Sequence, residues 1–291
     1  RDQLDRFGEI DKTAELLHTI AEHTTNGIVI NRDDPRLGAA AFAHQLTAPI
    51  CTYGVSPELL HLFPSDDSMR GGGLQRGSTA KINAEDVSLK SVDGQQAVIT
   101  YNSKDHAVTL KLKGIYNVQN AVGAVALVRM VLGDKLDEAK MLASLANVTP
   151  AFGRGESIMI GGDVCELVLV KNPSGFRLSL RSFDPANYAT MIAINDEYAD
   201  GRDMSWLWDV DFDSLQAVGV AVVSGVHTND MALRLQYDEV EMKYVNTSLT
   251  ESLNQLLSAT SGQPKRIYCS YTAILALRRE LAKRTTVETV R

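Results

Sequence analysis

The second half of the chain alternates short apolar runs with stretches of helical periodicity, and this alternation limits the fold more than any other feature. Apolar runs predict strands at residues 190–195, 217–224, 242–247 and 266–271. Helical spacing predicts helices at residues 228–237, 249–258 and 271–284. Strands that alternate with helices form parallel sheets, because each crossover helix returns the chain to the edge where the next strand starts. The pattern therefore predicts an α/β fold with a doubly wound, mostly parallel sheet.

The first half has a different order of predicted helices and strands. Helical spacing predicts helices at residues 9–22, 117–132 and 135–146, the second of them ending at Gly133. Strands are predicted at residues 27–31 and 48–55, with antiparallel strands within residues 87–113 and a polar loop between them at residues 56–86.

The pattern of predicted elements changes after Gly153. There "SIMIGGDVCELVLV" predicts a hairpin that turns at Gly161 and Gly162. We therefore place a domain boundary near residues 150–153 and divide the chain into residues 1–152 and 153–291.

Composition narrows the class of protein. The formal net charge of −7 argues against nucleic acid as a partner. No apolar run reaches the roughly 18–20 residues of a membrane span, so no transmembrane segment is expected. Cys51, Cys165 and Cys269 form no CxxC pair, which predicts reduced thiols and a cytoplasmic protein. The chain opens at Arg1 on polar sequence, and we expect it to be part of a longer polypeptide.

One stretch resembles a phosphate-binding loop but lacks its main functional residue. "GGLQRGST" (72–79) has the GxxxxG spacing, with Ser78 in place of the lysine that reaches the nucleotide phosphates. No predicted strand precedes it, so we interpret it as a flexible loop. Because the P-loop is absent, we expect this chain alone not to hydrolyse ATP.

Four other positions are candidates for nucleotide binding. Asn117 and Asn120 lie near a helix start, where an amide either caps the helix or contacts a base and ribose. Arg154 lies at the domain junction, where it either binds phosphate or has a structural role. Asn172 follows an apolar strand and precedes Pro173, a strong turn signal at the end of a strand where ligands bind.

The most acidic stretch, "INDEYADGRDMSWLWDVDF", runs from Ile194 to Phe212 and contains both tryptophans of the chain, Trp206 and Trp208. It starts at the predicted carboxyl end of a strand, which is the ligand side of such a sheet. The residues alone leave two interpretations open: a functional loop, or a solvated acidic loop held by two core tryptophans. His227 follows the next strand and is either a catalytic residue or a solvated loop histidine, and we favour the second interpretation.

Several segments resemble the Mur ligase superfamily when taken in order. In the first half these are "RDQLDR", "NRDDP", "LKGIYNVQNAVGA" and "FGRGE". In the second half "KNPSGF", the acidic stretch, "NDMALRLQY" and "YTAILALR" resemble the C-terminal domain of the superfamily's amidating members, the ligase-like subunits of lipid II isoglutaminyl synthase. The resemblance implies a partial Mur ligase central domain without its P-loop at residues 1–152. A Rossmann-like ligase domain at residues 153–291 would follow it.

The resemblance also implies an activity. In that family the subunit uses ATP and Mg²⁺ to activate the α-carboxylate of D-glutamate in lipid II, at the inner face of the membrane. A glutaminase partner, GatD, supplies ammonia, which attacks the acyl phosphate and leaves D-isoglutamine. The resemblance implies that Asn117, Asn120, Arg154 and Asn172 bind ATP. It makes Asp196, Asp200 and Asp203 the candidate catalytic acids, because carboxylates can orient ammonia or steer an ammonium ion.

The chain also departs from the family pattern. Gln3 replaces a histidine near the metal, and the position of the carbamylated lysine falls on His18. The acid that holds ribose, just before Asn172, is here Leu or Val. Cys51 has no partners for a zinc ribbon, so we predict no zinc and no metal ligands.

Two alternatives stay open: an amino-acid-adding ligase of the peptidoglycan or folylpolyglutamate type, and a non-catalytic fragment that binds a glutaminase. "ADGRDMSW" argues against the first, because members that add an amino acid usually carry basic residues there for the incoming carboxylate.

Overall fold

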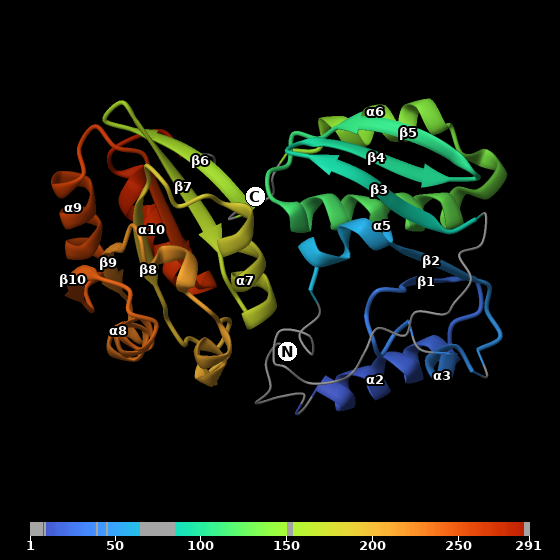
Figure 1. The fold of residues 1–291 in the computed structure, drawn as a ribbon, viewed down its shortest axis with the longest axis horizontal. Helices are drawn as coiled ribbons and strands as arrows, with labels where there is room; N and C mark the ends of the chain where they lie inside the picture. The colour runs from blue at the N-terminus through green and yellow to red at the C-terminus, as the bar shows by residue number, and fades with distance from the viewer. Residues whose placement is uncertain are drawn as a thin grey trace. The chain divides into compact units, whose positions relative to one another are not determined.

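The computed structural model describes residues 8, 10–38, 40–44, 46–64, 85–149 and 154–287. The segment 72–79 and Gln3 lie outside these ranges. Contacts divide the chain after Thr149 into two compact units, each with its own sheet (Figure 1).

The sheet of the first unit is half parallel and half antiparallel, in the order β1-β2-β3-β4-β5. Its strands are β1 (Ile28–Asn31), β2 (Ile50–Val55), β3 (Val87–Asp93), β4 (Gln96–Tyr101) and β5 (Lys104–Thr109). The first three strands are parallel, whereas β3, β4 and β5 form an antiparallel meander. The prediction of antiparallel strands within residues 87–113 is therefore confirmed, and β3 joins them to the parallel pair.

Helices of this unit lie mainly before and after the meander. They are α2 (Ile10–Glu22), α3 (Ala40–Ala43), α5 (Ile115–Leu132) and α6 (Glu138–Asn147), with short 3₁₀ turns η1 (Pro57–Leu62) and η2 (Gly133–Lys135). Helix α5 ends at Gly133, whose φ of +48° favours glycine, as the sequence predicts. Helix α6 starts three residues later than predicted, because the Asp137 carboxylate accepts a hydrogen bond from the Lys140 amide and caps the helix there.

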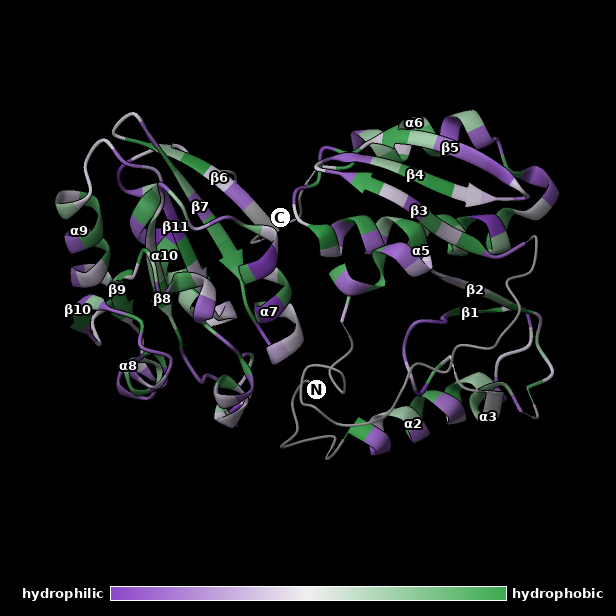
Figure 2. Ribbon diagram, in the orientation of Figure 1, coloured by the Kyte–Doolittle hydropathy of each residue, from purple (hydrophilic) through white to green (hydrophobic). Residues whose placement is uncertain are grey.

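Helix α5 is the core helix of this unit. It packs on β2 and β3 (Figure 1). It buries Val118, Ala121, Val122 and Val125. Much of it is apolar (Figure 2). Among the described helices, the stretch Ile115–Lys135 alone is long and apolar enough to cross a membrane. The core helix of a soluble domain passes the same test, so this is weak evidence for a span.

The sheet of the second unit is mostly parallel, in the order β10-β9-β8-β11-β7-β6. Its strands are β6 (Arg154–Ile160), β7 (Asp163–Leu169), β8 (Ala189–Ala193), β9 (Val220–Ser224), β10 (Met242–Asn246) and β11 (Lys265–Cys269). Only the β6–β7 hairpin is antiparallel, and its turn falls at Gly161 and Gly162, both with positive φ. The predicted hairpin and the predicted parallel sheet are both confirmed.

Every residue of β8 and β11 is buried, as expected for central parallel strands covered by helices. The helices are α7 (Pro173–Ser182), α8 (Thr228–Tyr237), α9 (Leu249–Ala259) and α10 (Tyr271–Ala282), with 3₁₀ turns η3 (Ser205–Asp209) and η4 (Asp213–Leu215).

Helix α7 differs from the sequence prediction, which places a turn at Asn172-Pro173. Proline is tolerated at the first helical position and asparagine is a good N-cap, so the same two residues begin a helix.

Candidate functional site

The carboxyl ends of β8, β9 and β11 lie side by side in the second unit. The register pairs Ala193 of β8 with Ser224 of β9 on one side and with Cys269 of β11 on the other. Ligands of open α/β sheets bind outside the carboxyl ends of the strands. The acidic segment starts at this edge, directly after β8.

Asn195, the second residue of that segment, connects the three strand ends. Its backbone N–H donates to Ser270 Oγ at 2.8 Å, and its Nδ2 donates to Thr272 Oγ1 at 3.2 Å. Its Oδ1 accepts from the backbone N–H of Val226 at 3.1 Å. The segments after β8, β9 and β11 are thus held together by one side chain and its backbone.

A glycine makes this close approach possible. Gly225 has a φ of +98°, and a Cβ there would lie 2.3 Å from the carbonyl oxygen of Ile194. No other residue type fits without moving the backbone of one of the two segments that follow β8 and β9.

Asp200 is buried and bonded at this edge. Its carboxylate accepts from the Thr272 backbone N–H at 2.9 Å, from Thr272 Oγ1 at 2.5 Å and from the Glu197 backbone N–H at 3.1 Å. Thr272 lies in the first turn of α10, where unpaired N–H groups favour a negative charge. Asp200 therefore fixes the acidic segment to α10.

Asp196 faces a histidine from the neighbouring strand end. Its Oδ2 lies 3.1 Å from His227 Nε2, an ion-pair contact rather than a well-aligned hydrogen bond. The other ring nitrogen, Nδ1, lies 2.6 Å from Asp230 Oδ2. Burial lowers the pKa of His227, but hydrogen bonding and charge from Asp230 and Asp196 outweigh it, so the net pKa is raised.

The interpretation of His227 as a solvated loop histidine is therefore wrong. Its side chain is only 22% exposed, and both of its nitrogens face carboxylates. Asp230, three residues further along a helix start, was a local signal for this pair. Asp196 gave no local signal, because it meets His227 only when β8 and β9 pair.

Asp203 belongs to the next turn rather than to the strand ends. It is exposed and accepts from the Ser205 backbone N–H at 2.9 Å, where η3 begins. Hydrogen bonds from the side chain and backbone of Ser205 lower the pKa of Asp203. The structure thus ties Asp196 and Asp200 to the strand ends and Asp203 to η3.

The second half of the acidic segment is anchored by aromatic packing. Trp206 and Phe212 are buried, and their ring centroids lie 6.4 and 5.2 Å from that of Phe176 on α7. Trp208 is 47% exposed and packs edge-on against Tyr237 of α8 at 5.3 Å. One tryptophan is therefore a core anchor, and the other covers the surface of α8.

The four candidates for nucleotide binding are spread over both units. Asn117 is buried inside α5, and its Nδ2 donates to the Lys113 carbonyl at 2.7 Å. Its interpretation as a helix N-cap is wrong, because α5 starts earlier, after Gly114. Asn120 is exposed on the same helix.

The other two candidates lie in the second unit. Asn172 caps α7 by accepting from the Gly175 N–H at 2.8 Å. The backbone of Arg154 pairs with Val168 at the start of β6.

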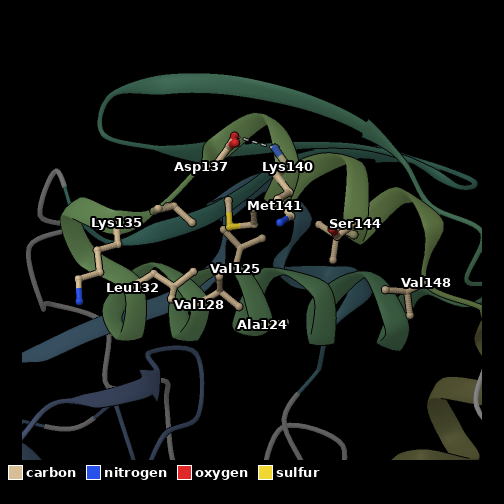
Figure 3. A pocket seen from close by; sticks show the side chains of 12 residues that line it. Ala124, Val125, Val128, Leu132, Lys135, Asp137, Lys140, Met141, Ser144 and Val148 are labelled. Atoms are coloured by element: carbon tan, nitrogen blue, oxygen red, sulfur yellow. Dashed lines mark hydrogen bonds between the residues drawn. The ribbon is translucent and has the colours of Figure 1, made fainter.

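A groove of about 540 Å³ lies between α5 and α6 (Figure 3). Its lining is mostly apolar and includes Val125, Val128 and Met141, with Lys135 and Lys140 also among the lining residues. None of the candidate residues lines it. Between residues 8 and 287, over the described ranges, no three His, Cys, Asp or Glu side chains are grouped to hold a metal ion.

Two family models match the chain in order. The Mur ligase middle domain matches residues 1–128, and the MurT ligase C-terminal domain matches residues 169–274. Two curated relatives, from Streptococcus pneumoniae and Staphylococcus aureus, are named lipid II isoglutaminyl synthase (glutamine-hydrolyzing) subunit MurT. Each is 28% identical to the chain, over 99% and 84% of its length respectively. The chain spans 69% and 60% of those two proteins.

Solved structures share the fold. A pseudomurein peptide ligase type C from Methanothermus fervidus aligns with 97% of the chain and 61% of its own, at a TM-score of 0.71 and 17% identity. A folylpolyglutamate synthase from Mycobacterium tuberculosis, solved with ADP and AMPPCP, covers 98% of the chain and 62% of its own, with a TM-score of 0.62 and 17% identity.

The two sheets and the two matched domains are similar to those of Mur ligases. Among these proteins, the chain is consistent with a MurT-type Mur-ligase-like protein.

Proposed function

We propose that this chain is the ligase part of an ATP-dependent enzyme that amidates lipid II. The α-carboxylate of D-glutamate is activated with ATP, and ammonia released from glutamine by a glutaminase partner, GatD, converts it to D-isoglutamine. The observation that carries the proposal is the acidic edge of the second sheet. It lies in the region that matches the MurT C-terminal domain, in a chain whose relatives bear the name of this activity.

The chemistry needs a base near the reacting carbon. A carboxylate oxygen of the substrate attacks the γ-phosphate of ATP, which forms an acyl phosphate and ADP. Ammonia then attacks the acyl carbon, phosphate leaves, and the nitrogen loses a proton. We assign to Asp196 the orientation of ammonia and the acceptance of that proton, because it is half-buried at the ligand edge of the sheet.

The other two acids have supporting roles in this proposal. Asp200 holds the segment on α10, and Asp203 holds the start of η3. Both would keep Asp196 at the strand end while substrate binds.

Nucleotide binding is the less complete part of the site. Asn117, Asn120, Arg154 and Asn172 are the proposed contacts. Asn120 is exposed for direct contact, whereas Asn117 and Asn172 hold turns of the backbone. No GxxxxGK[ST] motif occurs in the sequence, so we propose that polypeptide beyond it completes the phosphate site. Mg²⁺ is expected to accompany ATP, but the described residues group no three ligands for it, so none is assigned to the metal.

The proposed place of action is the cytoplasm, at the inner face of the membrane, where lipid II is made. The three cysteines are free and buried, which suits a reducing compartment.

The proposal is tested with the full-length protein co-purified with its glutaminase. Lipid II, ATP and glutamine are supplied, and the product is analysed by mass spectrometry. We expect amidated lipid II that depends on both ATP and glutamine, and that ammonium salt also supports without the glutaminase. Ligation of an amino acid in place of amidation would favour the amino-acid-adding alternative. Binding of glutaminase without any ATP turnover would favour the non-catalytic one.

A further inference from the structure

His227 connects the proposed catalytic acid to a neighbouring helix. Its ring lies between Asp196, on the segment after β8, and Asp230, on α8. Both nitrogens are within 3.1 Å of a carboxylate oxygen. The ring therefore bridges two elements that are far apart in sequence.

The two carboxylates on either side of the ring favour a proton on each nitrogen. A neutral imidazole has one N–H and one lone pair, so one nitrogen would direct its lone pair at a carboxylate. The imidazolium ion has an N–H on both sides and suits both acids. The charges that act on the ring are those of Asp196, from the segment after β8, and Asp230, from its own helix.

The backbone holds the ring in this position. The His227 N–H donates to the Ile194 carbonyl at 3.0 Å, and the preceding N–H, of Val226, donates to Asn195 Oδ1 at 3.1 Å. Gly225 permits the close approach of these two turns. Asp196 and His227 are thus carried by segments that are hydrogen-bonded to each other, which keeps the two side chains close.

We propose that His227 is a positioning residue for amidation, which as an imidazolium ion holds the Asp196 carboxylate in place at the ligand edge of the sheet. This inference rests on the proposed function. The charged form of His227 dominates below its pKa, and the contact with Asp196 weakens as pH rises through that value. The amidation rate should therefore decline at alkaline pH, as His227 loses its proton.

Two substitutions of His227 separate its charge from its bulk. His227→Gln removes the charge, and we expect kcat to fall roughly ten- to a hundredfold because Asp196 is misplaced, with the melting temperature nearly unchanged. His227→Arg keeps a permanent charge, and we expect it to retain activity. The ratio of wild-type to His227→Arg rates should fall as pH rises, and this ratio cancels pH effects on ammonia and ATP.

Asp230→Asn tests the second carboxylate. It removes a charge that raises the pKa of His227, so the alkaline decline should move to lower pH. NMR titration of the His227 ring in the same proteins gives a readout that does not depend on activity. We expect the wild-type ring to titrate above the ordinary value of about 6.5 and the Asp230→Asn ring to titrate lower. His61→Gln, an exposed histidine of the first unit, serves as the control and should change nothing.

The outcomes distinguish the two proposals. Wild-type protein that amidates nothing would contradict the proposed function. Wild-type protein that amidates lipid II, together with an unaffected His227→Gln variant or a pH-independent ratio to His227→Arg, would overturn the role of His227 alone. A His227 ring that titrates at or below the ordinary value would overturn it as well.

Discussion

The two halves of the acidic segment are built from similar residues but are held in place in different ways. Residues 195–203 carry acids whose partners are polar groups, such as His227 for Asp196 and Thr272 for Asp200. Residues 204–212 also carry acids, but this part of the segment is held by Trp206 and Phe212, whose rings pack against Phe176 of α7.

Arg234 strengthens the second half. It is buried, donates to the Val210 carbonyl at 2.7 Å and pairs with Asp238 at 2.5 Å. The comparison teaches that Asp196 and Asp200 are placed by polar contacts with the segments that follow other strands, whereas the later acids accompany an apolar anchor. Substitutions in the second half should therefore change stability, and substitutions in the first half should change activity or the contact with α10.

The largest stability effect is expected from the anchor. Phe212→Ala leaves a cavity beside Phe176, and we expect the free energy of unfolding to fall by about 3–5 kcal/mol. Guanidinium unfolding measures the change. The control is Leu233→Ala, at an exposed residue. A loss below about 1 kcal/mol would show that the second half is not held by this packing.

An intermediate effect is expected where the first half meets α10. Asp200→Asn preserves the shape of the side chain but removes the charge that accepts from Thr272, which should cost about 1–3 kcal/mol. A double-mutant cycle with Thr272→Val isolates the contact. Additive effects of the two substitutions would mean that Asp200 stabilises the segment through some other group.

The smallest effect is expected at Asp203. Asp203→Asn should change stability by no more than about 0.5 kcal/mol, because the carboxylate is exposed. The pKa of Asp203 is lowered in the folded state, so its contribution is present above the unfolded value near 3.9 and is lost as pH falls through the folded value. The difference in melting temperature between wild type and variant should therefore shrink towards low pH. A difference that grows on acidification would contradict this assignment.

Much of the fold follows from local sequence. Apolar runs and helical spacing predict the strands and helices of the second unit, because each pattern reflects burial within one element. Helix α7 differs from the prediction because Asn172-Pro173 fits both a turn and a helix start, and the rings that pack on Phe176 come from segments distant in sequence.

The candidate site is less predictable than the fold. The positions of Asp196 and Asp200 near the strand end follow from where β8 ends, and the sequence predicts that end. The contact of Asp196 with His227 depends on the pairing of β8 with β9, which no local pattern specifies. Helix α5 begins at Ile115, two residues before the predicted start at residue 117. This small difference places Asn117 inside the helix instead of at its N-cap.

Asp196→Asn in the full-length protein, co-purified with its glutaminase, tests the central claim most directly. Lipid II amidation and melting temperature are measured on the same preparation. We expect amidation to fall about 10²-fold or more, with stability within about 0.5 kcal/mol of wild type and the glutaminase still bound. Normal amidation by this variant would contradict the catalytic assignment, and loss of the bound glutaminase would place Asp196 at the subunit interface instead.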